Sequence, residues 1–228
     1  MKDDSKKWLK EVGERSLRQV GIKKGDIVLD FGCGSGNYTI PAARIVGEEG
    51  RVYAIDKDRR DLGKLMRKAN SEGLKNIERV ETSGKLKIDL EDESVDVVLL
   101  YDILHYYYFP RAGDRRKLLR EVYRILKPGT LLSVYPTHLQ SYRHPKLEDI
   151  KREIDSANFH LERECSVMLI HEETLENGQV LNFRKARKNK KGSSAHACSQ
   201  IRLGGSVLWL CFSMNRRRRT SGCKEHRS

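Results

Sequence analysis

Short apolar runs alternate with stretches of helical periodicity along most of the chain. Five runs fit buried strands, at residues 27–30, 51–55, 76–81, 95–100 and 130–135. Apolar residues recur at helical spacing in five other segments, at residues 1–20, 38–46, 59–71, 117–126 and 147–157. Strands that alternate with helices in this way predict an α/β fold with a doubly wound parallel sheet.

Two further strand-like segments follow, at residues 159–170 and 179–184, and no helix-length segment separates them. The sequence Glu176-Asn177-Gly178 between them carries a turn signal. We therefore expect the sheet to close with an antiparallel hairpin that turns at residues 176–178. In the helix expected over residues 1–20, Gly13 is the residue that least favours helical structure.

The length of 228 residues suits one α/β domain with its own core. The longest apolar runs, such as residues 95–100 and 207–212, are far shorter than the roughly 20 residues that a membrane span needs. The N-terminal segment is charged throughout and lacks the apolar centre of a signal peptide. We therefore expect no membrane contact and a cytoplasmic location.

The net charge of +13 is concentrated at one end of the chain. Residues 1–187 carry 35 Lys and Arg against 31 Asp and Glu, whereas residues 188–228 carry 10 against 1. The second segment has neither helical nor strand periodicity, and its cysteines match no common zinc-binding spacing. We interpret residues 1–187 as the domain and residues 188–228 as a basic tail, disordered or foreign to the domain. A native RNA-binding arm is the competing interpretation.

A glycine-rich loop, D-F-G-C-G-S-G at residues 30–36, follows the first strand. Its three glycines allow the backbone to pass close under a ligand and to turn into a helix whose free N–H groups face that ligand. Asp56 ends the second strand, where its two oxygens can accept both hydroxyls of a ribose. The carboxylate of Asp30 disfavours a pyrophosphate ligand and favours a cationic or amino-bearing one. Asn37 stands where a dinucleotide-binding loop has its third glycine.

Four segments, in order, resemble the motifs of the class I S-adenosylmethionine-dependent methyltransferases. VLDFGCGSGNYT resembles the first motif, VYAIDKD the second, SVDVVLLYDILHY the fourth and LKPGTLLSV the fifth, and the resemblance covers about residues 20–185. It implies S-adenosylmethionine as the cofactor. It also implies a Rossmann-like, mostly parallel sheet of seven strands with the last one antiparallel, in agreement with the expected hairpin.

The resemblance also implies roles for the residues of the first two motifs. Gly32, Gly34 and Gly36 would line the methionine part of the cofactor. Asp30 would help to hold its amino group, and Asp56 would bind its ribose.

The third motif departs from the family pattern, because Thr82-Ser83-Gly84 stands where many members have an acid that binds adenine. Ser83 is the candidate at this position, with backbone and apolar contacts as the alternative way of holding adenine. Asp102, directly after the fourth strand, is a further candidate for cofactor binding. Capping of the next helix is the alternative role for Asp102.

His105 and His138 follow the fourth and fifth strands, at the sheet edge where this topology holds its ligands. Histidine takes up a proton near neutral pH, so both are candidate catalytic residues that face the methyl acceptor. Packing within their loops is the alternative. The tyrosines at residues 106–108 are interpreted as a pocket wall. No Asp-Asn pair follows the fifth strand, so no metal site is expected.

The sequence favours an enzyme that transfers a methyl group from S-adenosylmethionine to an unidentified small molecule. No D-P-P-Y or N-P-P-Y sequence, typical of enzymes that methylate amino groups of nucleic acids, follows the fourth strand. Two alternatives stay open. One is an RNA-binding or RNA-modifying protein that uses the basic tail. The other is a nicotinamide-dependent oxidoreductase, which shares the topology and Asp56 but is disfavoured by Asp30 and Asn37.

Overall fold

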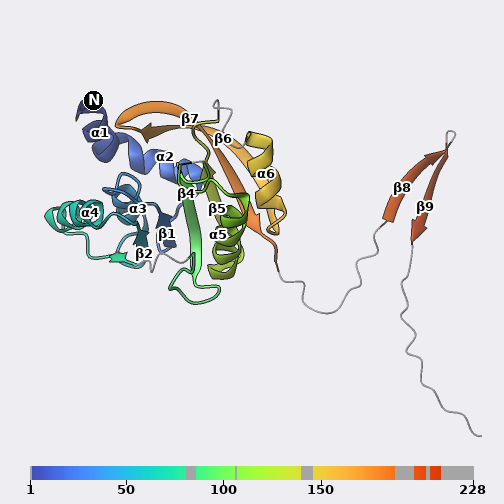
Figure 1. Cartoon of the computed structure of the whole chain (residues 1–228), viewed down its shortest axis with the longest axis horizontal. Coiled ribbons are helices and arrows are strands. Elements are labelled where there is room, and N and C mark those ends of the chain that lie inside the picture. Colours follow the sequence, from blue (N-terminus) through green and yellow to red (C-terminus); the bar gives the residue numbers. More distant parts are fainter. Residues whose placement is uncertain are drawn as a thin grey trace, which may run out of the picture. The chain divides into compact units, whose positions relative to one another are not determined.

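A central sheet organises the first part of the chain in the computed structural model (Figure 1). Its seven strands lie in the order β3-β2-β1-β4-β5-β7-β6. Their bounds are β1 Ile27–Phe31, β2 Arg51–Ile55, β3 Ile77–Arg79, β4 Val95–Tyr101, β5 Leu126–Tyr135, β6 Phe159–His171 and β7 Thr174–Lys185. Strands β1 to β5 pair in parallel, and β7 pairs antiparallel with both β5 and β6. The predicted doubly wound, mostly parallel sheet with a closing hairpin is confirmed.

The structure describes residues 2–80, 86–105, 107–139 and 146–187, and the backbone of residues 198–203 and 206–211. The chain divides into two compact units, Met1–Lys188 and Asn189–Ser228. No helix within the described ranges is both long enough and apolar enough to cross a bilayer.

The chain reverses direction across the sheet between β1 and β4. From β1 it winds outward to β2 and β3, and it then returns to β4 on the other side of β1. The register pairs Val28 with Val97 and Asp30 with Leu99, so the carboxyl ends of these two strands lie at the same level. In an open parallel sheet the crevice at such a reversal is where ligands bind.

Helices cover both faces of the sheet (Figure 1). One face carries the N-terminal helical segments and the two that follow β1 and β2, which are α1 Lys2–Lys7, η1 Trp8–Val12, α2 Gly13–Val20, α3 Thr39–Val46 and α4 Arg59–Ser71. The other face carries α5 Ala112–Ile125 and α6 Leu147–Asp155. Successive residues of β4 serve opposite cores, because Val97 and Leu99 belong to the first cluster and Val98 and Leu100 to the second.

The expected N-terminal helix contains a π-helical turn, Trp8–Val12, between its two α-helical parts. Gly13 follows this turn and packs closely against α3. A Cβ atom at Gly13 would lie 2.8 Å from Cγ of Pro41. Gly13 therefore allows close packing between α2 and α3 rather than interrupting the helix.

The hairpin turns at a different place from the one predicted. His171 pairs with Thr174, so the turn consists of Glu172 and Glu173, whose φ angles are 48° and 65°. Two left-handed residues of this kind form the type I′ turn that matches the strand twist. Gly178 lies within β7 instead, where a Cβ atom would come within 2.7 Å of the Tyr135 ring. The turn signal at residues 176–178 was wrong, because the glycine there serves close packing against Tyr135.

In the second unit, β8 Cys198–Leu203 pairs antiparallel with β9 Ser206–Cys211. The sequence pattern did not predict regular structure here. A ladder between two strands needs only paired backbone groups, so it can form without a periodic apolar pattern. The interpretation of residues 188–228 as foreign to the domain stays a prediction.

We expect a chain that ends at Arg187 to fold and melt as the full chain does. The last strand is anchored by Lys185, which is 3% exposed and whose Nζ donates a hydrogen bond of 2.6 Å to the Leu126 carbonyl. Circular dichroism melting of both chains measures this. A loss of the cooperative transition on truncation would show that the tail belongs to the domain.

Candidate functional site

The glycine loop after β1 is held in a left-handed conformation at three positions. Gly32, Gly34 and Gly36 have φ angles of 81°, 50° and 92°. The N–H groups of Gly32 and Cys33 donate hydrogen bonds of 2.8 and 3.0 Å to the Ile55 carbonyl, which ties the loop to the end of β2.

The three glycines differ in what lies next to them. A Cβ atom at Gly32 would lie 2.2 Å from Cδ1 of Ile103, and one at Gly36 would lie 2.4 Å from Cδ1 of Leu65. A Cβ atom at Gly34 would meet no described atom within 4 Å. Gly32 and Gly36 therefore allow close packing, whereas the loop faces open space at Gly34.

Asp56, directly after β2, contacts this loop from the side. Its Oδ2 accepts a hydrogen bond of 2.8 Å from the Gly34 N–H, and its Oδ1 accepts one of 2.8 Å from the Asp58 N–H. The carboxylate is partly exposed. The structure thus brings the Asp56 carboxylate, at the end of β2, to the open side of the glycine loop.

Asp30 is buried beneath the loop, with 2% of its surface exposed. Its Oδ2 accepts a hydrogen bond of 2.6 Å from the Thr39 hydroxyl at the start of α3. Burial raises the pKa of Asp30 to about 6, and the negative charge of Asp56 adds to the effect, while the Thr39 hydrogen bond opposes it.

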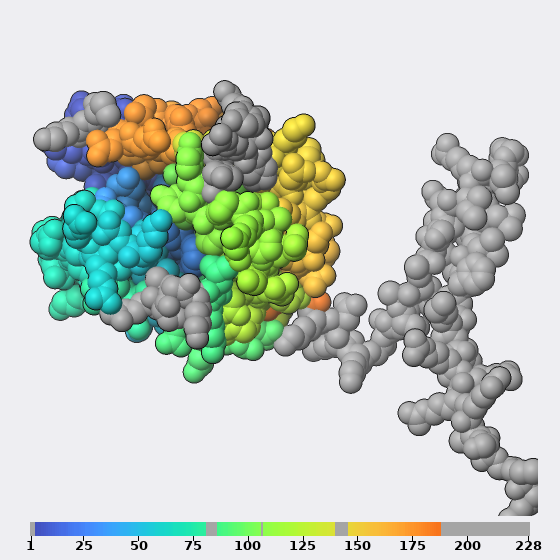
Figure 2. Space-filling model, viewed as in Figure 1, coloured from blue at the N-terminus to red at the C-terminus, as the bar shows by residue number. Residues whose placement is uncertain are grey.

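The surface is hollowed between α4 (cyan), the β6–β7 hairpin (orange) and the green segment that follows β4, and a blue N-terminal part of the chain lies on the floor of the hollow (Figure 2). Two hydrogen bonds tie the surrounding elements together. Trp8 Nε1 in the N-terminal helix donates one of 2.6 Å to the Asn37 carbonyl at the end of the glycine loop. The Tyr38 hydroxyl donates one of 2.7 Å to the Ile170 carbonyl in the hairpin.

A second set of polar side chains lies at the same edge of the sheet, around Asp102, which directly follows β4. Asp102 has a φ of 57° and its Oδ1 accepts a hydrogen bond from the Thr137 hydroxyl. Three histidine side chains approach this oxygen, and the distances from Oδ1 to their Nε2 atoms are 3.2 Å for His105, 3.5 Å for His138 and 3.6 Å for His171. We call these four residues the Asp102 cluster.

The two predicted histidines differ in their surroundings. His105 is buried, with 2% of its surface exposed. Its Nδ1 accepts a hydrogen bond of 3.2 Å from the Tyr107 N–H, and its Nε2 lies 2.9 Å from the Asp102 carbonyl oxygen. The His138 side chain is 28% exposed. His105 is thus held within its loop, while His138 reaches the surface.

The carboxylate of Asp102 is stabilised by its neighbours. Burial raises its pKa, but hydrogen bonds from His105 and Thr137 and electrostatic attraction to the imidazoles of His105 and His171 outweigh burial. The net result is a pKa below the ordinary value for aspartate.

Sequence reasoning missed His171 and Glu176, which the hairpin supplies. His171 ends β6, and its Nδ1 lies 3.5 Å from Oε1 of Glu176 in β7. The same Glu176 oxygen accepts a hydrogen bond from the Tyr135 hydroxyl. Burial and the Glu176 carboxylate raise the pKa of Tyr135 above its ordinary value. No motif marks either residue, since only the pairing of β6 with β7 brings them to this edge.

Two of the tyrosines after β4 lie at the surface, whereas Tyr106 lies outside the described residues. Tyr107 and Tyr108 are 70% and 47% exposed, and Lys57 Nζ lies 4.8 Å from the centre of the Tyr108 ring. Tyr108 therefore reaches from the loop after β4 toward the loop after β2. Ser83 lies outside the described residues.

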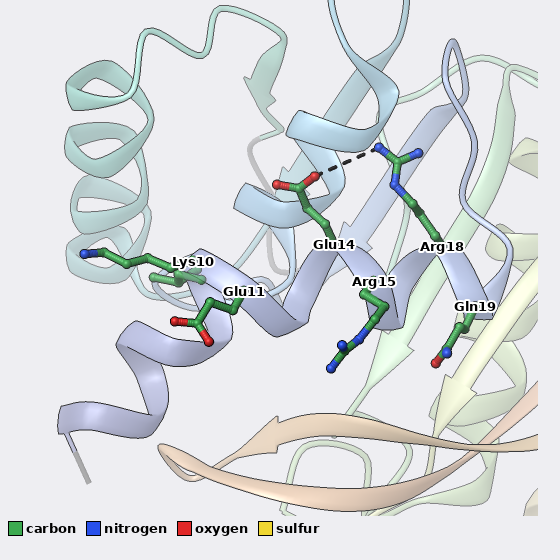
Figure 3. A pocket seen from close by; sticks show the side chains of 7 residues that line it. Lys10, Glu11, Glu14, Arg15, Arg18 and Gln19 are labelled. Atoms are coloured by element: carbon green, nitrogen blue, oxygen red, sulfur yellow. Dashed lines mark ion pairs between the residues drawn. The ribbon is translucent and has the colours of Figure 1, made fainter.

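A separate cavity of about 550 Å³ runs along the N-terminal helix (Figure 3). It is lined by Leu9, Lys10, Glu11, Glu14, Arg15, Arg18 and Gln19. Its lining is largely charged and contains none of the residues of the glycine loop or the Asp102 cluster. The predicted site residues therefore lie elsewhere, at the carboxyl edge of the sheet.

The part of the chain that holds the glycine loop is similar to known proteins. A family model described as a methyltransferase domain matches residues 28–129, a range that begins in β1 and includes the glycine loop, Asp56 and Asp102. The crystal structure of a SAM-dependent methyltransferase from Aquifex aeolicus superimposes with a TM-score of 0.60 and 28% identity, covering 78% of this chain and 92% of that one.

Curated relatives match over shorter shares of their length. Demethylmenaquinone methyltransferase of Geobacillus stearothermophilus is 30% identical over 123 residues, which are 54% of this chain and 48% of the relative. The ubiquinone/menaquinone biosynthesis C-methyltransferase UbiE of Klebsiella pneumoniae is 30% identical over 146 residues, 62% of this chain and 52% of the relative. The chain thus spans about half the length of these curated relatives. Together with the strand order and the glycine loop, these matches show that the chain contains a methyltransferase domain of the class I S-adenosylmethionine-dependent type.

Proposed function

We propose that this protein transfers a methyl group from S-adenosylmethionine to a small-molecule acceptor that lies against the Asp102 cluster. One observation carries the proposal. The open side of the glycine loop and the Asp102 cluster follow β1 and β4, which are neighbouring parallel strands. A methyl donor on the loop would therefore lie beside an acceptor at the cluster.

Asp56 is the proposed ligand of the cofactor's ribose. Each of its oxygens already accepts one backbone hydrogen bond, at 2.8 Å. A carboxylate has about four acceptor positions, so two remain for ribose hydroxyls. The same bonds hold the carboxylate in place before the cofactor arrives, which reduces the entropy lost on binding.

Asp30 is the proposed partner of the cofactor's amino group. Its buried carboxyl has a pKa of about 6, so at neutral pH it carries a poorly solvated negative charge. A ligand that brings a positive ammonium group to this end of the sheet compensates that charge. A pyrophosphate would add further negative charge, which disfavours a dinucleotide at this site.

Methyl transfer itself needs positioning more than covalent help from the protein. A lone pair of the acceptor attacks the methyl carbon, and the bond between that carbon and the sulfonium sulfur breaks. Its electrons stay on sulfur, which leaves neutral S-adenosylhomocysteine. Where the acceptor carries a proton on the attacking atom, that proton leaves to a base or to solvent. Holding donor and acceptor in line supplies most of the rate.

A small molecule is the favoured acceptor class. The two curated relatives are named for steps on menaquinone and ubiquinone precursors, and the exposed rings of Tyr107 and Tyr108 offer apolar surface to a ligand. Residues 1–187 carry a nearly balanced charge, which does not favour binding of a phosphate backbone. An RNA acceptor recruited by the basic tail is the second candidate, and truncation at Arg187 separates the two.

S-adenosylhomocysteine should stabilise the protein, whereas NAD should not. A ligand present at 100 times its dissociation constant adds about 2.7 kcal/mol to the free energy of unfolding, which for a domain of this size raises the melting temperature by about 5–11 °C. Thermal melting with each ligand measures this, and label transfer from S-adenosylmethionine to a pool of metabolites then tests the acceptor. A shift with NAD alone would contradict the proposal.

Asp56→Ala should weaken the binding of S-adenosylhomocysteine about a hundredfold, because hydrogen bonds to a charged group contribute roughly 1.5–3 kcal/mol each. Calorimetric titration measures the affinity. Asp58→Ala is the matched control, since its exposed carboxylate caps α4 through the Arg60 N–H and faces no proposed ligand. Equal affinity of the Asp56 variant and the parent protein would mean that the ribose is held elsewhere.

Asp30→Asn should stabilise the ligand-free protein at neutral pH but not in acid. The raised pKa means that the folded state binds its proton more tightly than the unfolded state, so the ionised carboxyl opposes folding increasingly between about pH 4 and pH 6 and fully above that range. Each pKa unit corresponds to about 1.4 kcal/mol, so the cost is on the order of 3 kcal/mol at pH 7 and disappears below about pH 4. Denaturant unfolding of both proteins from pH 4 to 8 measures the difference. Parallel stability curves would show that Asp30 carries no such cost.

A further inference from the structure

The Nε2 atom of His171 is buried and has no hydrogen-bond partner within the described parts of the chain. The other ring nitrogen, Nδ1, lies beside the Glu176 carboxylate at 3.5 Å. A carboxylate there favours a proton on Nδ1, which leaves a lone pair on Nε2. That lone pair faces Oδ1 of Asp102 at 3.6 Å, so two electron-rich atoms lie opposite each other. These two atoms repel each other unless a cation lies between them.

A second imidazole approaches the same oxygen from another element. Nε2 of His138, after β5, lies 3.5 Å from Oδ1 of Asp102. Two ligand atoms of a tetrahedral ion bound at about 2.0–2.2 Å lie about 3.4 Å apart. The distances of 3.5 and 3.6 Å from the Asp102 oxygen to the two imidazole nitrogens each match the separation of two ligands on one ion, and a ring nitrogen of His138 lies within 4.8 Å of one of His171.

His105 serves a different role in this group. Because its Nδ1 accepts the Tyr107 N–H, its Nε2 carries the proton and points at Asp102. A protonated nitrogen cannot ligate a metal, but it can orient a carboxylate that does. The Thr137 hydroxyl, which donates to the same carboxylate, acts in the same way.

We propose that Asp102, His138 and His171 bind one divalent transition-metal ion, with His105 as a positioning residue for Asp102. The inference rests on the proposed function, because the ion would sit at the acceptor side of the site. Two imidazoles and one carboxylate favour zinc, iron, cobalt, nickel or manganese over magnesium or calcium. Glu176 beside His171 Nδ1 completes the carboxylate–histidine–metal arrangement that is common at such sites.

Three protein ligands leave a coordination position open, as catalytic metal sites do. A hydroxyl or thiol bound there loses its proton near neutral pH, because a metal ion lowers the pKa of bound water to about 7. The proton leaves to solvent, and the oxygen or sulfur keeps the lone pair that attacks the methyl carbon while the sulfonium bond breaks. The site therefore selects a small acceptor that carries a hydroxyl or thiol group.

Cobalt titration of the full chain tests the metal site without any acceptor. After treatment with a chelator and removal of the chelator, the protein should bind one Co²⁺ with visible d–d bands and without the near-ultraviolet band of thiolate ligation. His171→Gln and His138→Gln should each weaken this binding at least tenfold. His105→Gln should weaken it about 10–100-fold without changing the shape of the bands, as a positioning role requires.

His160→Gln is the matched control, because His160 lies on the same hairpin strand but is exposed and faces Asp155 rather than the cluster. It should bind Co²⁺ as the parent protein does. The melting shift with S-adenosylhomocysteine should persist in the His138 and His171 variants, which separates a failure of the metal site from a failure of the proposed function. Absence of the d–d bands in the parent protein, or full binding by the His171 variant, would overturn the metal site.

Discussion

The parallel pairing of β1 with β4 is the constraint on which the candidate site depends. It sets Asp30 level with Leu99, so the segments that leave both strands emerge at one edge. One of them is the glycine loop, and the other begins with Asp102. The chain winds away from this line in both directions, which leaves a crevice at the ends of the two strands. A cofactor and an acceptor can therefore occupy adjacent positions supported by rigid strands.

The buried negative charge of Asp30 at this edge opposes folding, which is common where residues serve function rather than packing. The pKa of Asp30 is raised because the effect of burial outweighs the hydrogen bonds that the Thr39 hydroxyl and the Thr39 backbone donate to its carboxylate. The pKa of Asp102 is lowered instead, because hydrogen bonds from His105 and Thr137 outweigh the effect of its burial. The two carboxylates at this edge thus differ in how well their negative charge is compensated by neighbouring groups.

The closing hairpin adds what the parallel strands cannot supply. Its strands, β6 Phe159–His171 and β7 Thr174–Lys185, are longer than the parallel strands β1–β4. Their turn therefore reaches beyond the sheet edge, where the Ile170 carbonyl accepts the Tyr38 hydroxyl. The same geometry delivers His171 to Asp102 and Glu176 to Tyr135. The hairpin is thus both a structural edge of the sheet and one wall of the site.

The sequence by itself determined the sheet, the glycine loop and the positions of Asp30 and Asp56, because apolar runs, glycines and strand-end acids are local signals. It also placed His138 at the correct edge, since residues that directly follow parallel strands lie at the carboxyl edge of the sheet. The tertiary structure alone decided that His171 joins Asp102, because an antiparallel register between distant segments has no local signal. It also showed that the hairpin turns at Glu172 and Glu173 and not at Gly178. Gly178 is a glycine because it packs closely against Tyr135, and not because the backbone turns there. Long-range pairing, rather than composition or periodicity, thus assembled the Asp102 cluster.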